Sequence, residues 1–438
     1  MNMQEKYISV EQALSFVKSN DMIVTGLGAA EAGLFMGQLH TIAHRVRNVT
    51  VTNCLPTHPS EIYKPDYVDS FNVDGWFFAP QMRKAHANGN MAFIPNHLHL
   101  AAVKRLAFVK PNIYVGAASM PDKHGYISLS LSNTYEKRMI EAADLVMLEV
   151  NPNMPYTLGD VQVPVEDVDY LIRADYMPPV TPDLPFSEKD AAIGKLIADM
   201  VPDGACIQLG IGGIPNAVAA ALETKNDLGV HTEMLTSGMM RLAKMGVING
   251  KRKQINKGKM VTTFAMGIPE LYEFMDYNPG IAVMDGAWTN DPYTIAQNDN
   301  QISINTSIEV DLTGQCASES IGSRQFSGTG GQADTAIGAQ MSKNGKSIIA
   351  LYSTAMVKDP ETGERHEVSK IVPQLMSGAA VSLSRNDVDR VVTEYGVAEL
   401  RGTSIRDRVA RLIEIAHPKF REELWEQAVE TGILGRRR

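Results

Sequence analysis

A glycine-rich turn between a strand pattern and a helix pattern constrains the fold of this chain more than any other stretch. Residues 205–209, apolar except for Gln208, predict a buried strand that runs into Gln208-Leu-Gly-Ile-Gly-Gly-Ile-Pro215. Pro215 suits the first position of a helix, because its missing N–H needs no partner there, and residues 216–222 continue as an alanine-rich helix. Free backbone N–H groups and the helix dipole attract anions to such a turn. The sequence therefore predicts an α/β unit with an anion-binding turn at the end of its strand.

A single carboxylate follows this turn after about one helix. Glu233 lies in Gly229-Val-His-Thr-Glu-Met-Leu-Thr-Ser-Gly238, a short strand pattern whose apolar neighbours would partly enclose it. A structural glutamate at a strand end is an equally good interpretation of these residues alone. Its position beside an anion-binding turn favours a carboxylate nucleophile, which needs a dry pocket and backbone donors for the oxyanion.

Strand and helix patterns alternate along the first half of the chain. Strands are predicted over residues 21–25, 49–52, 113–117, 126–130 and 145–150, and helices over residues 11–17 and from the glycine turn at 26–28 to about 47. This alternation indicates a mainly parallel sheet with helices packed on its faces.

A proline-rich segment divides the chain. Residues 176–186 contain four prolines in eleven positions, which makes the segment stiff, extended and unsuited to a helix or a sheet interior. Ser187-Glu-Lys-Asp190 then opens a helix with a serine cap and an acidic first turn. We therefore predict an N-terminal domain over residues 1–180 and a C-terminal domain over residues 187–438.

The two predicted domains resemble weak copies of one another. Residues 20–28 match residues 203–212 loosely when Gly26 is laid on Gly210, and a helix and a short strand follow in each copy. That strand holds Val51 in the first copy and Glu233 in the second, 25 and 23 residues beyond the aligned glycines. The pseudo-repeat predicts two similar open, mainly parallel α/β domains, of which only the second carries the carboxylate.

A second glycine-rich stretch lies in Phe326-Ser-Gly-Thr-Gly-Gly-Gln-Ala-Asp334. Many glycines in an ordered enzyme indicate backbone brought close to a ligand, whereas a flexible linker is the alternative. The apolar runs at residues 302–304 and 347–351 are typical of core strands, so an ordered loop is favoured. The chain ends in helices predicted over residues 404–415 and 419–429.

Composition excludes several classes of function. The 438 residues carry a net charge of -9, and basic residues gather only in short runs such as Arg436-Arg-Arg438, so a nucleic-acid partner is not expected. No apolar run reaches the ~20 residues of a membrane span, and the first residues have no signal-peptide core, which predicts a soluble cytoplasmic protein. The cysteines, Cys54, Cys206 and Cys316, have no metal-type spacing and are interpreted as small core residues in a reducing compartment.

Other site chemistries fit the sequence poorly. Gly210-Ile-Gly-Gly-Ile-Pro215 has proline where a dinucleotide fingerprint needs its third glycine, and no Walker sequence occurs. His40 and His44 stand four residues apart without a general-base glutamate between them, so no metal site is predicted. No serine sits in a G-x-S-x-G elbow.

Several motifs, in the same order, resemble the 4-hydroxybutyrate/butyryl-CoA:acetate CoA-transferases of the acetyl-CoA hydrolase/transferase family (class I CoA-transferases) over essentially the whole length. Besides the glycine turn and the glutamate motif, these are Met120-Pro-Asp-Lys-His-Gly125, Asn256-Lys-Gly-Lys-Met260, Ile304-Asn-Thr, Glu309-Val-Asp311, Gln325-Phe-Ser-Gly-Thr-Gly-Gly-Gln332, Ser384-Arg-Asn-Asp387 and Val392-Thr-Glu-Tyr-Gly396. The resemblance implies two ribose-phosphate-isomerase-like α/β domains with the active site between them.

The resemblance also implies roles for individual residues. Catalytic roles fall on Glu233 as the nucleophile, Asn290 near the reacting oxygen and Gly331 in the glycine loop. Binding of coenzyme A falls on Gln208, Leu209, Gly210, Ile211, Gly212, Ile308, Gly330, Gly331 and Lys358. Lys358 is included because Met356 stands where the family often has lysine, and a lysine two residues later would replace it.

The chemistry that the resemblance implies is CoA transfer without a permanently bound cofactor or metal. Coenzyme A is then a substrate, linked covalently to Glu233 in the intermediate, and the partners are acyl-CoA and short-chain carboxylic acids in a homodimer or higher homo-oligomer. An acyl-CoA hydrolase on the same scaffold and a ligand-sensing protein without activity are the alternatives. Acetate, butyrate, 4-hydroxybutyrate, succinate and itaconate all remain possible acids, and the turn at residues 26–31 is expected to help line the acyl side.

Overall fold

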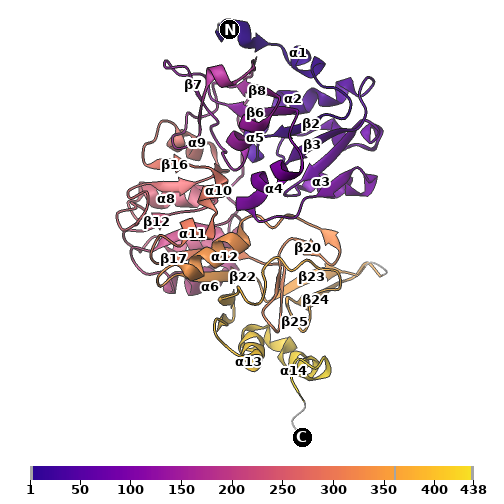
Figure 1. Ribbon diagram of the computed structural model, residues 1–438. Helices are drawn as coiled ribbons and strands as arrows, with labels where there is room; N and C mark the ends of the chain where they lie inside the picture. Colours follow the sequence, from indigo (N-terminus) through magenta and orange to yellow (C-terminus); the bar gives the residue numbers. More distant parts are fainter. Residues whose placement is uncertain (1–2, 360–361, 436–438) are drawn as a thin grey trace.

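The computed structural model describes residues 3–359 and 362–435, so Arg436-Arg-Arg438 lies outside the described residues. Two large open sheets dominate the described fold, one built from the first half of the chain and one from the second (Figure 1), and the other strands form small sheets of two or three strands. The first sheet has eight strands, all parallel, in the order β1-β10-β8-β6-β2-β3-β4-β5. Their bounds are β1 Tyr7–Ile8, β2 Met22–Thr25, β3 Val49–Asn53, β4 Phe71–Gly75, β5 Met91–Phe93, β6 Ile113–Ala118, β8 Leu145–Val150 and β10 Tyr170–Arg173.

The second sheet has six strands in the order β12-β11-β17-β22-β26-β27, and only its last pair, β26 with β27, is antiparallel. Its strands are β11 Cys206–Leu209, β12 Gly229–Val230, β17 Gln301–Thr306, β22 Lys346–Ala350, β26 Arg390–Thr393 and β27 Gly396–Glu399. Both sheets are therefore mainly parallel, as the alternating pattern predicted. Such sheets are covered by helices and leave the carboxyl ends of their strands free for a site.

The pseudo-repeat corresponds to a shared βαβ arrangement. In the first half β2 leads through a glycine turn and helix to β3, its parallel neighbour. In the second half β11 leads through α7 (Gly213–Ala221) to β12, also its parallel neighbour. The segment between the last strand of the first sheet and α6 (Glu188–Asp199), residues 174–187, has neither helix nor strand. The predicted domain boundary falls inside this segment and stays a prediction.

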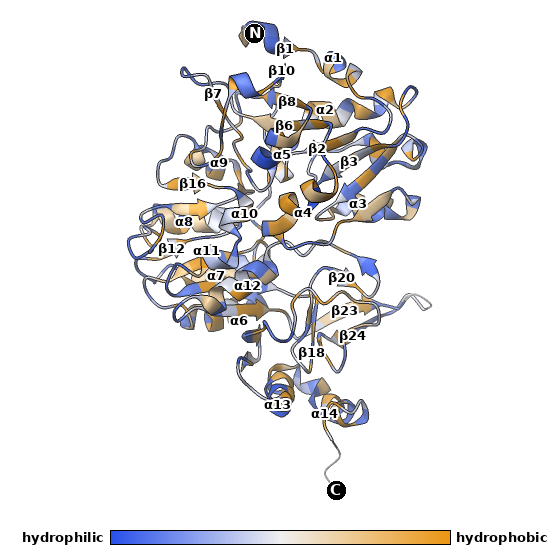
Figure 2. Cartoon of the chain, in the orientation of Figure 1, coloured by the Kyte–Doolittle hydropathy of each residue, from blue (hydrophilic) through white to orange (hydrophobic). Residues whose placement is uncertain are grey.

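Helices cover the sheets, and two helices form the C-terminal part of the described chain. The serine cap predicted at Ser187 is present, with reciprocal hydrogen bonds between Ser187 and Asp190 at the start of α6. Ser404 caps α13 (Ile405–Ile415) in the same way, and α14 (Arg421–Glu430) follows it. Along α13 and α14 polar and apolar residues alternate in colour in Figure 2, which is typical of helices with one buried face. The remaining described helices of six or more residues are α1 Val10–Ser15, α2 Gly33–Gln38, α3 Pro80–Ala85, α4 Ala101–Phe108, α5 Glu136–Ala142, α8 Ser237–Lys244, α9 Pro269–Met275 and α12 Gln332–Met341.

One predicted helix is wrong in length. The segment from residue 28 to 47 is divided into a short turn at Gly28–Ala30, α2 (Gly33–Gln38) and a 3-10 turn at Leu39–Ile42. The side chain of Glu149 accepts hydrogen bonds from the backbone N–H groups of Leu34 and Phe35 at the start of α2. The buried carboxylate on β8 therefore fixes where α2 begins, which the sequence pattern does not show.

The halves share one hydrophobic core. A single cluster of buried side chains contains residues of the first sheet, such as Val24 and Leu148, and of the second, such as Ile207 and Ile304. Two further clusters lie on the other face of the first sheet and under α13 and α14. Among the described residues, no helix is long and apolar enough to cross a membrane.

Candidate active site

A cavity of about 280 Å³ lies between the carboxyl ends of the two sheets. The first sheet contributes residues that directly follow β2, β3 and β4, and the second contributes the ends of β11 and β17. Parallel strands end at the same edge of their sheet, so residues distant in the sequence meet there. The ends of both sheets thereby form the walls of one site.

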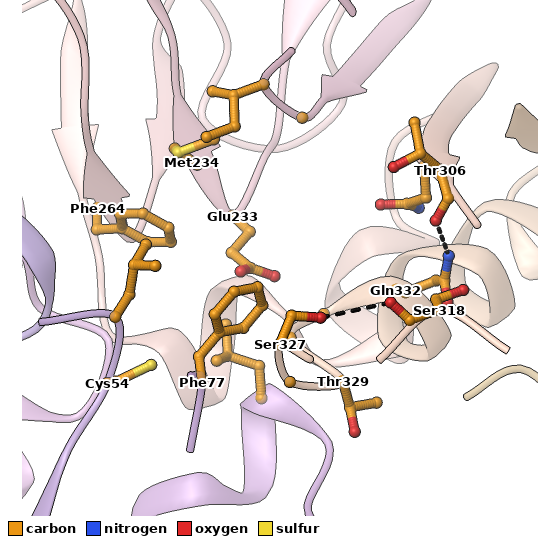
Figure 3. A pocket seen from close by; sticks show the side chains of 18 of the residues that line it. Cys54, Phe77, Glu233, Met234, Phe264, Thr306, Ser318, Ser327, Thr329 and Gln332 are labelled. Carbon is orange, nitrogen blue, oxygen red and sulfur yellow. Dashed lines mark hydrogen bonds between the residues drawn. The ribbon is translucent and has the colours of Figure 1, made fainter. Parts of the chain in front are cut away.

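Glu233 lines this cavity from a bend between β12 and β13 (Met234–Leu235). The prediction that it lies within a strand is wrong, because the chain leaves the sheet after His231 and turns before β13 begins. The bend is fixed through the carbonyl of Glu233, which accepts hydrogen bonds from the backbone N–H groups of Thr263 (2.9 Å) and Phe264 (3.1 Å). The bend therefore holds the side chain toward the cavity (Figure 3).

Two groups hydrogen-bond the Glu233 carboxylate. Nδ2 of Asn290 donates to Oε2 over 3.0 Å, and the backbone of Gly331 supplies a second hydrogen bond. Burial raises the pKa of Glu233 from 4.5 to about 7; the two hydrogen bonds oppose this shift, and the charge of Asp334 adds to it. The group is therefore poised between its neutral and ionised forms near neutral pH.

Gly331 approaches the carboxylate so closely that only glycine fits. A Cβ built on Gly331 would overlap both Nδ2 of Asn290 and Oε2 of Glu233. A Cβ on Gly330 would stand 3.6 Å from Oε1 of Glu233, and Gly330 has a φ of +53°, a conformation that favours glycine. These two glycines bring backbone N–H groups to the start of α12, where the helix dipole favours negative charge. The predicted ordered glycine loop is thus present.

The turn after β11 has the predicted strand–turn–helix order with one correction. Helix α7 begins at Gly213, so Pro215 occupies its third position, and Gly212, with a φ of 115°, precedes the helix as its cap. Only glycine adopts that conformation without strain, so the helix begins directly after Gly212. The helix therefore starts two residues before Pro215, which the sequence had placed at the first helical position. The side chain of Gln208 is anchored across the sheet: its Oε1 accepts from the backbone N–H of Ile304 over 3.1 Å.

The cavity has two chemically different walls (Figure 3). The polar wall carries amide and hydroxyl groups; its members are Gln208, Asn305, Thr306, Ser318, Thr329 and Gln332. The apolar wall lies on the other side of Glu233; its members are Leu27, Cys54, Leu55, Trp76, Phe77 and Phe264. Glu233 stands between the two walls.

Comparison with known proteins agrees with this geometry. The N-terminal domain of the acetyl-CoA hydrolase/transferases matches residues 1–182, and the C-terminal domain of the same family matches residues 267–428. The chain belongs to the acetyl-CoA hydrolase/transferase family.

Several relatives within this family are named CoA-transferases, and two less similar ones, from Candida albicans and Neurospora crassa, are named acetyl-CoA hydrolases. The succinyl-CoA:cyclohexane-1-carboxylate CoA transferase of Geobacter metallireducens is 41% identical over 97% of this chain and 95% of its own length. The 4-hydroxybutyrate coenzyme A transferase of Clostridium kluyveri is 40% identical over 97% of both chains. Among solved structures, RipA from Yersinia pestis superposes with a TM-score of 0.89 at 32% identity, covering 99% of this chain and 100% of that one. The CoA-transferase fold expected from the motifs is therefore confirmed.

The structure brings most of the predicted site residues of this family member together. Glu233, Gly330 and Gly331 line the cavity, and so do Gln208, Leu209, Gly210 and Ile211. Asn290 is buried behind them, at the end of α10 (Gly286–Thr289), and reaches the cavity through its hydrogen bond to Glu233.

Three predicted binding residues lie outside the cavity lining. Gly212 caps α7, and Ile308 follows β17 with its N–H donating to the carbonyl of Ala317. Lys358 ends β23 (Thr354–Lys358), where it pairs with Arg365 of β24 (Arg365–Ser369) in an exposed hairpin. Met356, on the same strand, is 58% exposed. Contacts of these residues with coenzyme A stay predictions.

Sequence reasoning missed the role of His231 and the site position of Cys54. His231 is buried, and its Nε2 lies 2.7 Å from the carbonyl of Thr289, the residue before Asn290. Burial lowers the pKa of His231 to about 3, so the ring is neutral and donates to that carbonyl. Cys54, interpreted only as a core residue, is buried and also forms part of the apolar wall. No metal-ligating group of three or more side chains occurs among the described residues.

Proposed function

We propose that this protein transfers coenzyme A from a short-chain acyl-CoA to a free carboxylate, by ping-pong chemistry through a glutamyl-CoA thioester on Glu233. The observation that carries the proposal is the partly buried carboxylate of Glu233 beside Asn290 and Gly331, in a cavity that is also lined by the glycine turn before α7. The Geobacter metallireducens and Clostridium kluyveri relatives support the proposal, because both are named CoA-transferases.

The first half-reaction has two steps, one at the thioester carbonyl carbon and one at the carboxyl carbon of Glu233. An ionised Oε of Glu233 attacks the thioester carbonyl, the C–S bond breaks, and CoA leaves as a thiolate from an acyl-glutamyl anhydride. The thiolate then attacks the glutamyl carbonyl, the anhydride C–O bond breaks, and the first acid leaves as a carboxylate. An incoming carboxylate reverses both steps. Each step exchanges one activated acyl bond for another, so the chemistry needs no external energy source.

The surrounding groups would stabilise the charge that moves in these steps. The Asn290 amide and the Gly331 backbone already lie at the glutamyl oxygen, where a tetrahedral oxyanion develops when the thiolate attacks. Donors fixed before the reaction stabilise that oxyanion without reorganising. The turn at Gly210 and Ile211 would hold the CoA end, since it joins a strand end to the N-terminus of α7.

The experiment is a transfer assay with a covalent trap. Purified protein is incubated with acetyl-CoA and butyrate, and butyryl-CoA is measured by chromatography. A second sample is treated with acetyl-CoA and then with borohydride, and its peptides are analysed by mass spectrometry. We expect butyryl-CoA formation and reduction at Glu233, and neither in Glu233→Ala. CoA release that does not depend on butyrate would favour a hydrolase, and full transfer by Glu233→Ala would refute the proposal. The homodimer and the cytoplasmic location remain predictions.

A further inference from the structure

Five of the six residues of the apolar wall lie at three neighbouring strand ends of the first sheet, and Phe264 from the second half completes it. Leu27 follows β2, Cys54 and Leu55 follow β3, and Trp76 and Phe77 follow β4. Backbone hydrogen bonds join these ends: Gly28 N–H to the Cys54 carbonyl (3.2 Å), Leu55 N–H to the Phe77 carbonyl (3.0 Å) and Trp76 N–H to the Asn53 carbonyl (3.0 Å). The wall therefore cannot rearrange easily to accept a different ligand.

This wall is also locked against the glycine loop that holds Gly331. The N–H of Phe78 donates to the Ser327 carbonyl over 3.2 Å, and a Cβ on Gly328 would overlap the carbonyl of Trp76. Phe77 and the Glu233 carboxylate consequently lie close together in Figure 3. A group bound covalently at Glu233 has the apolar wall on one side at a fixed spacing.

The CoA end of a thioester belongs on the opposite side. The glycine turn follows β11, which pairs with β17, and Thr306 lies at the end of β17. The polar wall offers partners for the amides of the pantetheine arm, such as Oδ1 of Asn305 and the hydroxyl of Thr306. With CoA on that side of Glu233, the acyl group lies against the apolar wall.

Charge decides which acyl groups fit there. None of the described residues that line the cavity is lysine, arginine or histidine, and Glu233 itself adds negative charge when ionised. A carboxylate buried without a partner is strongly disfavoured, because it loses hydration that nothing replaces. Burial also raises the pKa of the Cys54 thiol well above its usual value, so the apolar wall is uncharged at neutral pH.

We propose that the acyl group carried by this enzyme is uncharged and apolar, and that the apolar wall excludes a second carboxylate. Acids of the butyrate, pentanoate or cyclic-carboxylate type are then substrates, whereas dicarboxylates of equal length are not. This specificity rests on the proposed CoA transfer. Among the acids that the sequence leaves open, it favours butyrate over the dicarboxylates succinate and itaconate. The Geobacter relative, in contrast, has a dicarboxylic acyl-CoA, succinyl-CoA, in its name.

The test compares acids of matched length with acetyl-CoA as the donor. The values of kcat/KM are measured at pH 8 for pentanoate against glutarate and for hexanoate against adipate, so that only the terminal group differs. We expect each monocarboxylate to be favoured by at least about 100-fold. A ratio below about 5 in both pairs would overturn the proposal.

A charge placed on the wall should change this ratio. Leu55 is only partly buried, so Leu55→Lys has room to fold, and Leu55→Met is its uncharged match. We expect Leu55→Lys to shift the pentanoate-to-glutarate ratio at least about 10-fold toward glutarate, while Leu55→Met keeps the preference for pentanoate. Circular dichroism checks the fold of both. An unchanged ratio in a folded Leu55→Lys variant would count against the apolar wall as the acyl site.

Failure of the proposed function gives a different result. If no acid of the panel accepts CoA, transfer is refuted, and the acyl preference is then read from binding. Calorimetry with Glu233→Ala compares butyryl-CoA with succinyl-CoA, where tighter binding of butyryl-CoA supports the apolar wall. Equal or tighter binding of succinyl-CoA refutes it.

Discussion

The side-chain amide of Asn290 donates to Oε2 of Glu233 over 3.0 Å, although the two residues are 57 positions apart. Asn290 is itself buried, and its Oδ1 has no hydrogen-bond partner among the described residues. The hydrogen bond from Nδ2 holds the carboxylate of Glu233 in place. It opposes the effect of burial on the pKa of Glu233.

Removal of this donor should slow the reaction and shift its pH dependence. In Asn290→Ala the glutamyl oxyanion loses one fixed donor, so we expect kcat to fall roughly 10²–10³-fold. The pKa of Glu233 should also rise, because one of the groups that lowers it is gone. A pH profile of kcat/KM for the first half-reaction measures both effects. A slower enzyme with an unmoved acid limb would show that Asn290 does not act on the free carboxylate.

The rate should follow the ionisation of Glu233 in the wild-type enzyme. Burial holds its pKa at about 7, and only the ionised form attacks a thioester. We therefore expect kcat/KM to rise about tenfold per pH unit below 7 and to level off above it. Rapid-quench measurement of the acetate released from acetyl-CoA in the first half-reaction, between pH 5 and 8.5, measures this limb. A flat profile across pH 5.5–8 would contradict the raised pKa.

Gly331 should tolerate no side chain. A Cβ there would overlap both Asn290 and Glu233, so Gly331→Ala should displace the carboxylate and lower kcat by more than about 100-fold. Gly37, in α2, is a matched control, because a Cβ on it meets nothing within 4 Å. Gly37→Ala should keep wild-type activity and a similar melting temperature. Comparable loss of activity in both variants would point to a general effect on folding.

A buried carboxyl in the first half should make stability depend on pH. Glu31 is 0% exposed; burial raises its pKa to about 7, while its Oε2 accepts from the backbone of Thr57 and His58. The folded chain thus keeps the proton to about pH 7 while the unfolded chain loses it near 4.5. The stabilisation that this carboxyl contributes is fully present below pH 4.5 and is lost as pH rises through 7.

Replacement of Glu31 by glutamine removes this dependence. Oε1 of Glu31 has no partner among the described residues, so an amide NH₂ can take its place while the amide oxygen keeps the two backbone bonds. We expect Glu31→Gln to gain about 1–3 kcal/mol in unfolding free energy at pH 8, and little at pH 5, since one pKa unit corresponds to about 1.4 kcal/mol. Urea unfolding at the two pH values measures the difference. An equal effect at both would refute the assignment.

The sequence predicted the parts of the site that lie in local motifs. The glycine turn after Leu209 and the enclosed Glu233 could be found because short-range pattern and turn chemistry determine them. Leu27 also falls within the turn at residues 26–31 that was expected on the acyl side.

The rest depends on long-range packing. Cys54, Trp76 and Phe77 are single apolar residues after strands, which look like ordinary core residues until the sheet brings them together. His231 contacts the carbonyl of Thr289, 58 residues away in the chain, and no local pattern shows that contact. Helix α2 begins where Glu149 meets it, more than a hundred residues away in the chain.

The two sheets contribute different parts of the site. The reactive carboxylate and its donors come from residues after 205, whereas five of the six apolar-wall residues directly follow β2, β3 and β4 of the first sheet. Drift in the loops after β2, β3 and β4 can therefore alter which acid is accepted while the bond-making groups stay in place. Grafting those three loops from a relative with another acid in its name would change the acid specificity of the enzyme and leave its catalytic residues unchanged.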